Sequence, residues 1–270
     1  MQGGTAKAAT ELVGATPSAQ PGEVGIIGAG RFGSYFAGQL ERVGYVVHSA
    51  DVRTDPATYA RDLGRACAAP TVIYAVPIRS LERVVCETRD RLAPDSVVVD
   101  VCSVKIIPCA ILERTLPGRA VAGTHPLFGR ESAPESCAGQ RVALCVPNGL
   151  RGTAAGDVGA ARAEQLFTAL GLRIVRCTPE DHDAQVARSQ FLTHFIARGT
   201  TRCGIGRLAL STKTHDDLMD IVDIACHDSD ELFEDMAAFN PMVAHVRSDF
   251  LDALQAIGEH LQGLERRVNL

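Results

Sequence analysis

The stretch Val-Gly-Ile-Ile-Gly-Ala-Gly-Arg-Phe-Gly, residues 24–33, joins a short apolar run to a glycine-rich turn. In a strand–turn–helix unit, Gly28 would permit the tight turn and Gly30 would let a pyrophosphate approach the backbone. Gly33 would let the helix pack closely on the strand. The free N–H groups at the positive end of that helix attract phosphate. The stretch therefore predicts a dinucleotide site with contacts from residues Gly28, Ala29, Gly30, Arg31, Phe32 and Gly33.

An acidic residue downstream of the turn indicates which dinucleotide is bound. Asp51 lies about 20 residues after the turn, where a carboxylate binds the adenosine ribose hydroxyls. This favours NAD, because a 2′-phosphate would meet a like charge. Arg53 would attract such a phosphate, so NADP is an alternative, and Asp51 as a solvated strand end is another interpretation. Val76, at the end of a later apolar run, is a further predicted cofactor contact.

Around this motif, apolar runs of strand length alternate with segments of helical periodicity, which is typical of a parallel sheet covered by helices. The strand-like runs cover residues 23–27, 46–51, 71–76, 96–101, 121–124, 141–146 and 173–177. The helical segments between them cover residues 32–43, 80–92, 107–116 and 160–170. We predict an α/β fold, a Rossmann-type doubly wound and mostly parallel sheet over residues 23–178.

After Pro179 the strand-like runs stop, and we predict an all-helical C-terminal substrate and dimerisation domain over residues 179–270. Its helical segments cover residues 180–203, 216–225, 231–239 and 242–264, with Asp216 and Asp228 as N-caps and a break at Asn240-Pro241. The last segment repeats apolar residues at helical spacing, namely Leu251, Leu254, Ile257 and Leu261. Such a stripe must pack on other helices or on a second subunit, so we predict a homodimer.

The composition argues against nucleic acid and membrane partners. The 270 residues carry a formal net charge of −5, with a pI near 5.9, so no basic field attracts phosphates. No run of 18 apolar residues occurs, and residues 1–22 predict a disordered leader rather than a secretory signal. The nine cysteines are scattered without a C-x-x-C pair, which indicates reduced thiols rather than a metal site or disulfides. We expect a cytoplasmic enzyme that acts on a small molecule.

Two segments follow later strands at the edge where doubly wound sheets bind ligands, residues 100–105 and 124–132. A histidine there, His125, can take a proton from a substrate alcohol as hydride leaves, if its pKa lies near neutrality. Ser103 can orient His125 or share its hydrogen bond. By position alone, a structural role is the alternative for both.

Four motifs in this order resemble the prephenate and arogenate dehydrogenase family. They are Asp-Val-Cys-Ser-Val-Lys at 100–105, Thr-His-Pro-Leu-Phe-Gly-Arg-Glu-Ser at 124–132, Glu-Asp-His-Asp at 180–183 and Ser-Gln-Phe-Leu-Thr-His at 189–194. The resemblance runs from about Glu23 to Leu261 and is closest in wording to the plant-type arogenate dehydrogenases. It implies oxidative decarboxylation of a cyclohexadienol with hydride transfer to NAD(P), in tyrosine biosynthesis. Arogenate would give tyrosine, and prephenate would give 4-hydroxyphenylpyruvate.

Carried over by position, the resemblance also implies residue roles. His125 would hydrogen-bond the ring hydroxyl and assist its deprotonation, with Ser103 in support. His194 would close the substrate pocket, and Gln190 of the same motif would contact the substrate. Without the motif, His194 on a helix with Phe191 and neighbouring apolar residues would be interpreted as a core residue.

The substrate's two carboxylates require cations, and we predict Arg130 and Lys213 as their partners. Many bacterial prephenate dehydrogenases have an arginine about where this chain has Asp220-Ile-Val-Asp223. Plant-type members also lack it, and their Thr-Lys pair matches Thr212-Lys213 here. Asp183 would pair with the amine of arogenate, which prephenate lacks; a helix-start charge is its alternative role.

Other functions remain as alternatives. A relative acting on 4-amino-4-deoxyprephenate would have nearly the same sequence. A 3-hydroxy acid dehydrogenase would need a lysine on the first helix of its second domain, and residues 180–203 contain none. A non-catalytic NAD-sensing protein would have lost Ser103, His125 and His194, which are all present. We also expect that any feedback by tyrosine acts at the active site, since no regulatory domain follows Leu270.

Overall fold

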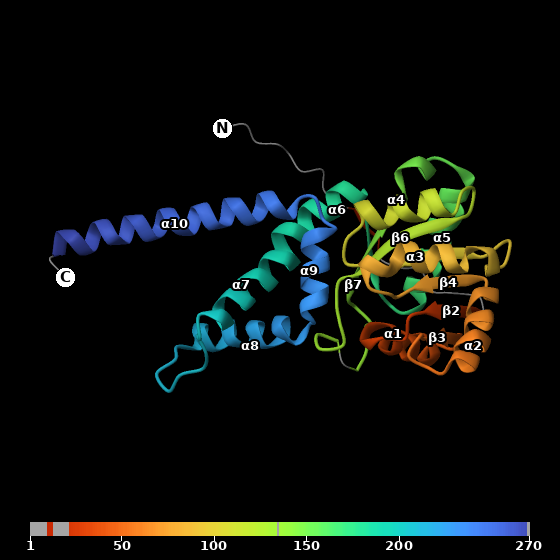
Figure 1. Cartoon of the computed structure of the whole chain (residues 1–270), viewed down its shortest axis with the longest axis horizontal. Helices are drawn as coiled ribbons and strands as arrows, with labels where there is room; N and C mark the ends of the chain where they lie inside the picture. Colours follow the sequence, from red (N-terminus) through yellow and green to blue (C-terminus); the bar gives the residue numbers. More distant parts are fainter. Residues whose placement is uncertain (1–9, 13–21, 134, 269–270) are drawn as a thin grey trace. The chain divides into compact units, whose positions relative to one another are not determined.

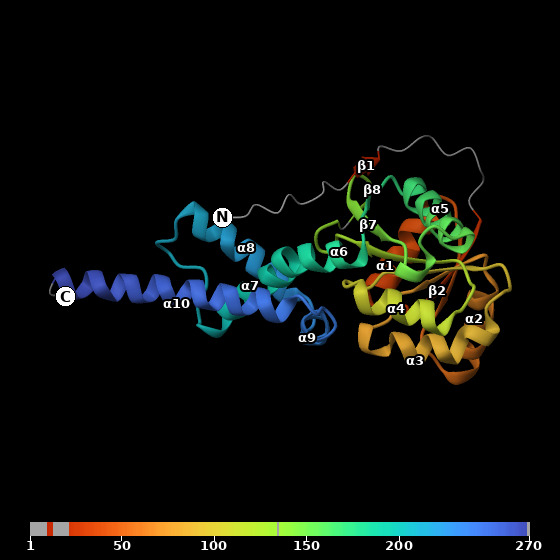
Figure 2. The ribbon, with the colours of Figure 1, turned by 90° about the horizontal axis from the view of Figure 1, so that it is seen from above.

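The computed structural model describes residues 10–12, 22–133 and 135–268 (Figures 1 and 2). The chain divides into two compact units, Met1–His182 and Asp183–Leu270, which are described separately. Among the described residues, no helix has the length and apolar character that a membrane crossing requires.

The first unit contains an eight-stranded sheet with the order β1-β8-β7-β6-β5-β4-β2-β3. The strands are β1 (Thr10–Leu12), β2 (Glu23–Ile27), β3 (Val46–Ala50), β4 (Thr71–Tyr74), β5 (Val97–Asp100), β6 (Val121–Pro126), β7 (Arg141–Cys145) and β8 (Arg173–Arg176). Pairing is parallel from β3 through β6 and between β7 and β8, and antiparallel for β6–β7 and β1–β8. The predicted Rossmann-type, mostly parallel sheet is confirmed.

Helices cover both faces of this sheet (Figure 2). They are α1 (Arg31–Arg42), α2 (Pro56–Ala68), α3 (Ile78–Thr88), α4 (Ile106–Thr115) and α5 (Ala154–Ala169), with short turns η1 (Arg89–Arg91) and η2 (Asn148–Leu150). On one face, Phe36 and Leu40 of α1 and Phe167 of α5 pack on alternate strand residues such as Ile26 and Val99. This alternation is the period of two that a strand requires, and it leaves the other face for α2, α3 and α4.

The predicted leader needs a correction at three residues. Thr10–Leu12 is not disordered; it forms β1, which pairs with Arg176, Val175 and Ile174 of β8. The edge strand β8 offers backbone N–H and C=O groups that an extended segment can pair with, and such pairing demands little of the sequence. Residues 1–9 and 13–21 of the predicted leader lie outside the described residues.

The second unit is helical, as the sequence predicts. After α6 (Pro179–Val186) come the π-helical turn η3 (Ala187–Phe191), α7 (Leu192–Arg202), α8 (Lys213–His227), α9 (Asp230–Ala238) and α10 (Val243–Val268). Phe191 and Met236 are buried in one small core, and Ala197 and Met219 in another. The predicted N-caps Asp216 and Asp228 are wrong. The hydroxyls of Thr212 and Ser229 cap α8 and α9, since each accepts a backbone N–H three residues on.

Candidate active site

The glycine turn between β2 and α1 has the backbone geometry that its sequence predicts. Gly28 has a φ of +103°, and a Cβ atom there would lie 2.4 Å from the carbonyl oxygen of Ala75. A Cβ atom on Gly33 would lie 1.9 Å from the carbonyl oxygen of Gly28. Gly30, the N-cap of α1, has no other atom within 4 Å of its Cβ position. The turn is therefore closed on its inner side and open at Gly30, where a phosphate would approach.

Asp51 and Arg53 form one network with the turn. The Asp51 carboxylate accepts a hydrogen bond from the backbone N–H of Ala29 at 3.0 Å, and from Nε and Nη2 of Arg53 at 2.8 and 2.7 Å. Arg53 Nη2 also donates to the carbonyl oxygen of Ala29. The hydrogen bonds from Arg53 lower the pKa of Asp51, so this carboxylate is ionised at the sheet edge where a ribose would bind.

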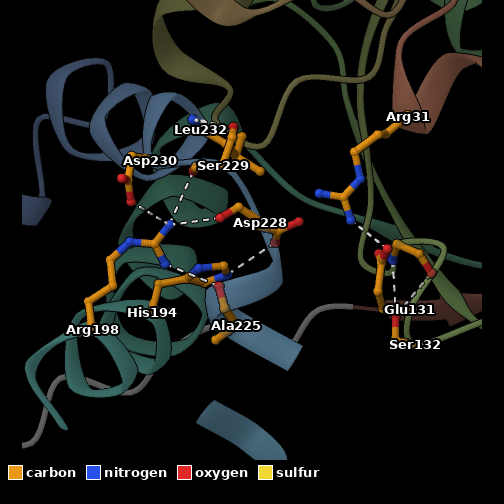
Figure 3. Close-up of polar contacts among 11 residues, drawn as sticks. Arg31, Glu131, Ser132, His194, Arg198, Ala225, Asp228, Ser229, Asp230 and Leu232 are labelled. Atoms are coloured by element: carbon orange, nitrogen blue, oxygen red, sulfur yellow. Dashed lines mark hydrogen bonds and ion pairs between the residues drawn. The ribbon is translucent and has the colours of Figure 1, made fainter. Parts of the chain in front are cut away.

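A cavity of about 520 Å³ lies over the glycine turn and is rich in arginine. Its lining includes Gly30 and four arginines, Arg31, Arg42, Arg53 and Arg130. Guanidinium groups around open backbone suit a diphosphate, so the residues present fit a dinucleotide. Arg130 is predicted to hold a substrate carboxylate. The structure places it in the lining of this cavity, where the segment after β6 meets α1 through the ion pair between Arg31 and Glu131 at 2.5 Å (Figure 3), and its contact with a substrate stays a prediction.

Two other predicted cofactor residues, Phe32 and Val76, pack around the glycine turn. The ring of Phe32 stacks on Phe36, with centroids 5.5 Å apart, and lies 6.4 Å from the ring of Phe128. Phe32 thus packs at the margin of the core and anchors the first turn of α1. Val76 lies against the turn, with its Cγ1 atom 2.9 Å from the Cβ position of Gly28.

The end of β5 holds a buried ion pair that the sequence analysis did not single out. Asp100 and Lys105 are both fully buried, and the Lys105 ammonium pairs with Asp100 Oδ1. Burial alone would lower the pKa of Lys105, but the Asp100 carboxylate, together with the nearby Cys102 and Cys109, raises it above its ordinary value. The backbone N–H of Cys102 also donates to Asp100 Oδ1, at 2.9 Å. The pair holds the loop that carries Ser103. Its signal was an acid and a base five residues apart inside an otherwise apolar stretch.

Ser103 is itself buried, and its Oγ atom is one of five buried side-chain polar atoms without a hydrogen-bond partner in the described part of the chain. Parallel strands β5 and β6 end at the same sheet edge as β2, so Ser103 and His125 lie on neighbouring strand ends. A buried hydroxyl without a partner is costly in a folded protein and is expected where a ligand supplies the partner.

His125 has a partner other than the predicted one. Its Nδ1 atom lies 2.9 Å from Nε2 of His182, with the two rings in an edge-on arrangement. Ser103 does not make this hydrogen bond, because its Oγ has no hydrogen-bond partner among the described residues. Burial, followed by the nearby His182 and Lys105, lowers the pKa of His125 well below its ordinary value. His125 is therefore uncharged at neutral pH, and its pKa lies below the near-neutral value that the sequence analysis required of a base. Its neutral ring still offers a lone pair to a proton.

In the second unit, Gln190 and His194 lie one helical turn apart on η3 and α7. Gln190 Oε1 and His194 Nδ1 are both buried without a hydrogen-bond partner, two more of the five described atoms in that state. His194 Nε2 lies 3.6 Å from Asp228 Oδ2 (Figure 3). Burial lowers the pKa of His194, while Asp228 opposes this shift. Two buried acceptors on one helix face, beside a π turn, suit a ligand with N–H or O–H donors.

Arg198 fixes the turn that carries Asp228. Its guanidinium is buried and donates to the carbonyl oxygens of Ala225, Asp228 and Ser229 at 2.9–3.2 Å (Figure 3). It also lies over the ring of Phe233, 4.7 Å from the centroid. These contacts join the end of α8 to the start of α9 and so hold Asp228 beside His194. No sequence motif had indicated this role.

The last two predicted substrate residues differ in their surroundings. Asp183 is fully buried, and its carbonyl oxygen accepts a hydrogen bond from Nδ2 of Asn240 at 2.9 Å. Lys213 is exposed at the first turn of α8 and pairs with Asp217. Asp228 follows the other end of α8, a helix of 15 residues and about 22 Å, so within one chain Lys213 does not reach His194. The structure does not bring Lys213 together with the other predicted residues of this unit.

A glycine turn of this geometry on a mostly parallel sheet, followed by a helical unit, defines a Rossmann-type nucleotide-binding protein. The family model "Prephenate dehydrogenase, nucleotide-binding domain" matches residues 52–154, and the model "TYRAAT1-like, C-terminal domain" matches residues 200–269. Arogenate dehydrogenase 2 of Arabidopsis thaliana, a chloroplastic protein, is 30% identical over 239 residues, which cover 81% of this chain and 64% of that protein. The chain is therefore similar to the prephenate and arogenate dehydrogenase family, over residues 52–154 in the nucleotide-binding model and over 81% of its length in the Arabidopsis relative.

Other relatives extend the comparison. A probable arogenate/prephenate dehydrogenase of Methanocaldococcus jannaschii is 27% identical over 203 residues, 72% of this chain and 44% of that protein. Among solved structures, the fold is similar to prephenate dehydrogenase of Aquifex aeolicus in complex with hydroxyphenyl propionate and NAD+, with a TM-score of 0.71, 20% identity and coverage of 93% and 94% of the two chains. The structure of Synechocystis arogenate dehydrogenase is similar with a TM-score of 0.63 and 20% identity, and the match covers 90% of this chain and 93% of that chain. The chain spans 64% and 37% of the two Arabidopsis arogenate dehydrogenases.

Proposed function

We propose that this chain is an NAD-dependent dehydrogenase that oxidatively decarboxylates arogenate to tyrosine. The observation that carries the proposal is His125, a buried and uncharged histidine at the carboxyl end of β6, next to the strand end that bears the unpartnered hydroxyl of Ser103. A base and a hydrogen-bonding group at the ligand edge of a nucleotide-binding sheet suit the oxidation of an alcohol. Similarity to the family supports a cyclohexadienol as that alcohol.

The residues act on the ring hydroxyl. His125 accepts the hydroxyl proton as the carbon–hydrogen bond of the same carbon breaks, and Ser103 hydrogen-bonds the oxygen. The nicotinamide cofactor, when bound, accepts the hydride. Loss of carbon dioxide from the opposite ring carbon makes the ring aromatic, and the phenolate oxygen takes the proton back from His125. Protons and charges then balance, with tyrosine, carbon dioxide and the reduced cofactor as products.

The side-chain end of the substrate is the basis for choosing arogenate. Asp183 is a buried carboxylate, and Gln190 and His194 present buried acceptors without partners. An ammonium group satisfies such acceptors, whereas the keto group of prephenate offers no donor. Prephenate and 4-amino-4-deoxyprephenate are the substrates that a test has to separate from arogenate. For the carboxylates, Arg130 and Lys213 remain our proposed partners, with Lys213 supplied by a second copy of the chain.

NAD is the cofactor we propose, with NADP as the alternative. The Asp51 carboxylate is ionised and held in place by Ala29 and Arg53, so it is oriented to accept ribose hydroxyls. The same Arg53 guanidinium is available to a 2′-phosphate only if it leaves Asp51.

The oligomeric state depends on the last helix of the chain. Helix α10 carries exposed apolar residues at helical spacing, which are Leu251, Leu254, Ile257, Leu261 and Leu264. We propose that a second copy of the chain covers them in a homodimer. A cytoplasmic location remains a prediction from the sequence.

A cofactor reduction assay of the purified chain tests the function. Arogenate, prephenate and 4-amino-4-deoxyprephenate are each offered with NAD and with NADP. We expect the highest kcat/KM for arogenate with NAD. Absence of activity with all three substrates would refute the proposal, and a preference for prephenate would refute the choice of arogenate.

The Asp183→Asn variant tests the amine contact. We expect its kcat/KM to fall about 10- to 100-fold for arogenate but to change less than about threefold for prephenate, because only arogenate carries an ammonium group. An unchanged ratio between the two substrates would remove Asp183 from the substrate site.

A further inference from the structure

We propose that His182 is a positioning residue that holds His125 in the tautomer with its proton on Nδ1, so that Nε2 is the base of the reaction. The inference rests on the proposed function of His125. Its basis is the 2.9 Å separation between His125 Nδ1 and His182 Nε2. Both atoms belong to the first compact unit, because His182 is its last residue and lies in the first turns of α6.

Burial makes this hydrogen bond matter. His125 and His182 are only 4% and 3% exposed, so water does not compete for the two nitrogen atoms. A buried imidazole N–H without a partner is costly in free energy, which means that the contact must contain one proton and one lone pair. Two nitrogens 2.9 Å apart meet this requirement only if one ring donates and the other accepts.

The two possible arrangements differ in what they leave on Nε2 of His125. If His182 Nε2 donates, the single proton of neutral His125 lies on Nε2, and His125 cannot act as a base. If His125 Nδ1 donates, Nε2 carries a lone pair and can accept the hydroxyl proton. The substrate hydroxyl, as a donor, selects the second arrangement. His182 must then be an acceptor, and a side chain without a lone pair at this position would leave the tautomer of His125 unset.

The same contact stabilises the charged state during the reaction. When His125 takes the proton it becomes an imidazolium beside the ammonium of Lys105, whose own charge is balanced by Asp100. The Nδ1–H of that imidazolium then donates to the lone pair on His182 Nε2 in a charge-assisted hydrogen bond, which is stronger than a hydrogen bond between two uncharged groups. His182, Lys105 and Asp100 are the titratable groups that face His125 through this network. His182 therefore offsets both burial and repulsion at the moment of proton transfer.

Two variants at one position test the proposal. His182→Gln keeps an acceptor, the amide oxygen, near the position of Nε2, whereas His182→Phe fills the space without one. We expect kcat to fall about 100-fold in His182→Phe and less than about tenfold in His182→Gln, with the dissociation constant of NAD nearly unchanged in both. His215→Phe, which removes a ring bonded only to the carbonyl oxygen of Gly206, is the matched control and should keep full activity.

A spectroscopic readout separates positioning from packing. In protein labelled with ¹⁵N-histidine, we expect His125 to show a protonated Nδ1 and an unprotonated Nε2 in the wild type and in His182→Gln, and a mixture of tautomers in His182→Phe. A wild type with the proton on Nε2, or equal kcat values for the Phe variant and the wild type, would overturn the proposal. If His182→Phe does not fold, a loss of activity in His182→Gln larger than about 100-fold would also overturn it. An inactive wild type would refute the proposed function, while the tautomer of His125 would still decide this inference.

Discussion

The buried position of His125 determines its protonation state. A free histidine is half protonated near pH 6.5, but burial and the neighbouring His182 and Lys105 favour the neutral ring. We predict that His125→Asn, which keeps a polar side chain at this position but removes the base, lowers kcat about 10²- to 10⁴-fold. The affinity for NAD, measured by fluorescence titration, should change little, since the glycine turn is untouched. Equal losses in turnover and affinity would assign His125 a structural role.

The same buried histidine links stability to pH. In the unfolded chain His125 binds a proton near pH 6.5, whereas in the folded chain it binds one only at a lower pH. The folded state is therefore favoured above pH 6.5, and this stabilisation is lost as the pH falls. His194, whose pKa is also lowered, acts in the same direction. We predict that the free energy of unfolding falls between pH 7 and pH 5, by up to about 1.4 kcal/mol per pH unit for each histidine. Urea titrations should show a shallower decline in His125→Asn, and an identical slope would count against the shift.

Among elements, the β2–α1 junction has the least tolerance for added volume. A methyl group on Gly33 would lie 1.9 Å from a backbone oxygen, so the helix and the strand would have to move apart. We predict that Gly33→Ala destabilises the chain by about 1–3 kcal/mol and weakens NAD binding at least tenfold.

The matched control is Gly64→Ala in α2, where the Cβ position has no neighbour within 4 Å. It should stabilise the chain by about 0.5–1 kcal/mol, as seen in urea unfolding. Similar effects of both substitutions would contradict the close-packing argument.

Elements with a regular apolar pattern were predictable from sequence, and elements that depend on polar signals were less so. Every strand from β2 to β8 coincides with an apolar run. The reason is clearest for β4, β5 and β6, whose residues are all buried because helices cover both faces of the sheet. Helix α2 was missed. Its apolar residues are sparse, and its start depends on Pro56 and on the Asp55 carboxylate, which accepts from the N–H of Thr58 at 3.1 Å. Strand β1 pairs through backbone atoms and leaves no pattern at all.

At the site, sequence indicated positions but not partners. The motifs placed Ser103, His125 and His194 among the residues that the structure buries. They did not reveal that His125 pairs with His182, because 57 residues separate the two and only the fold brings them together. Arg130 shows the same limit. Its charge suggested a substrate contact, and the sequence could not indicate that the path of the chain after β6 also places it in the lining of the cavity over the glycine turn.

At the scale of the whole molecule, helix α10 of the second unit carries apolar side chains that the described part of the chain leaves exposed. The stripe on α10 continues over Leu251, Leu254, Ile257, Leu261 and Leu264, each at least 41% exposed. Burial of apolar area in a dimer contributes about 25 cal/mol per Å², and a charge placed in such an interface is strongly unfavourable. We therefore predict that Leu254→Glu and Ile257→Glu convert a dimer to a monomer in sedimentation velocity experiments.

Leu210→Glu is the matched control, because Leu210 is 97% exposed in the loop before α8 and lies off the stripe. It should leave the dimer intact. A wild-type chain that sediments as a monomer at all concentrations, or a Leu254→Glu variant that remains dimeric, would show that α10 is not the interface.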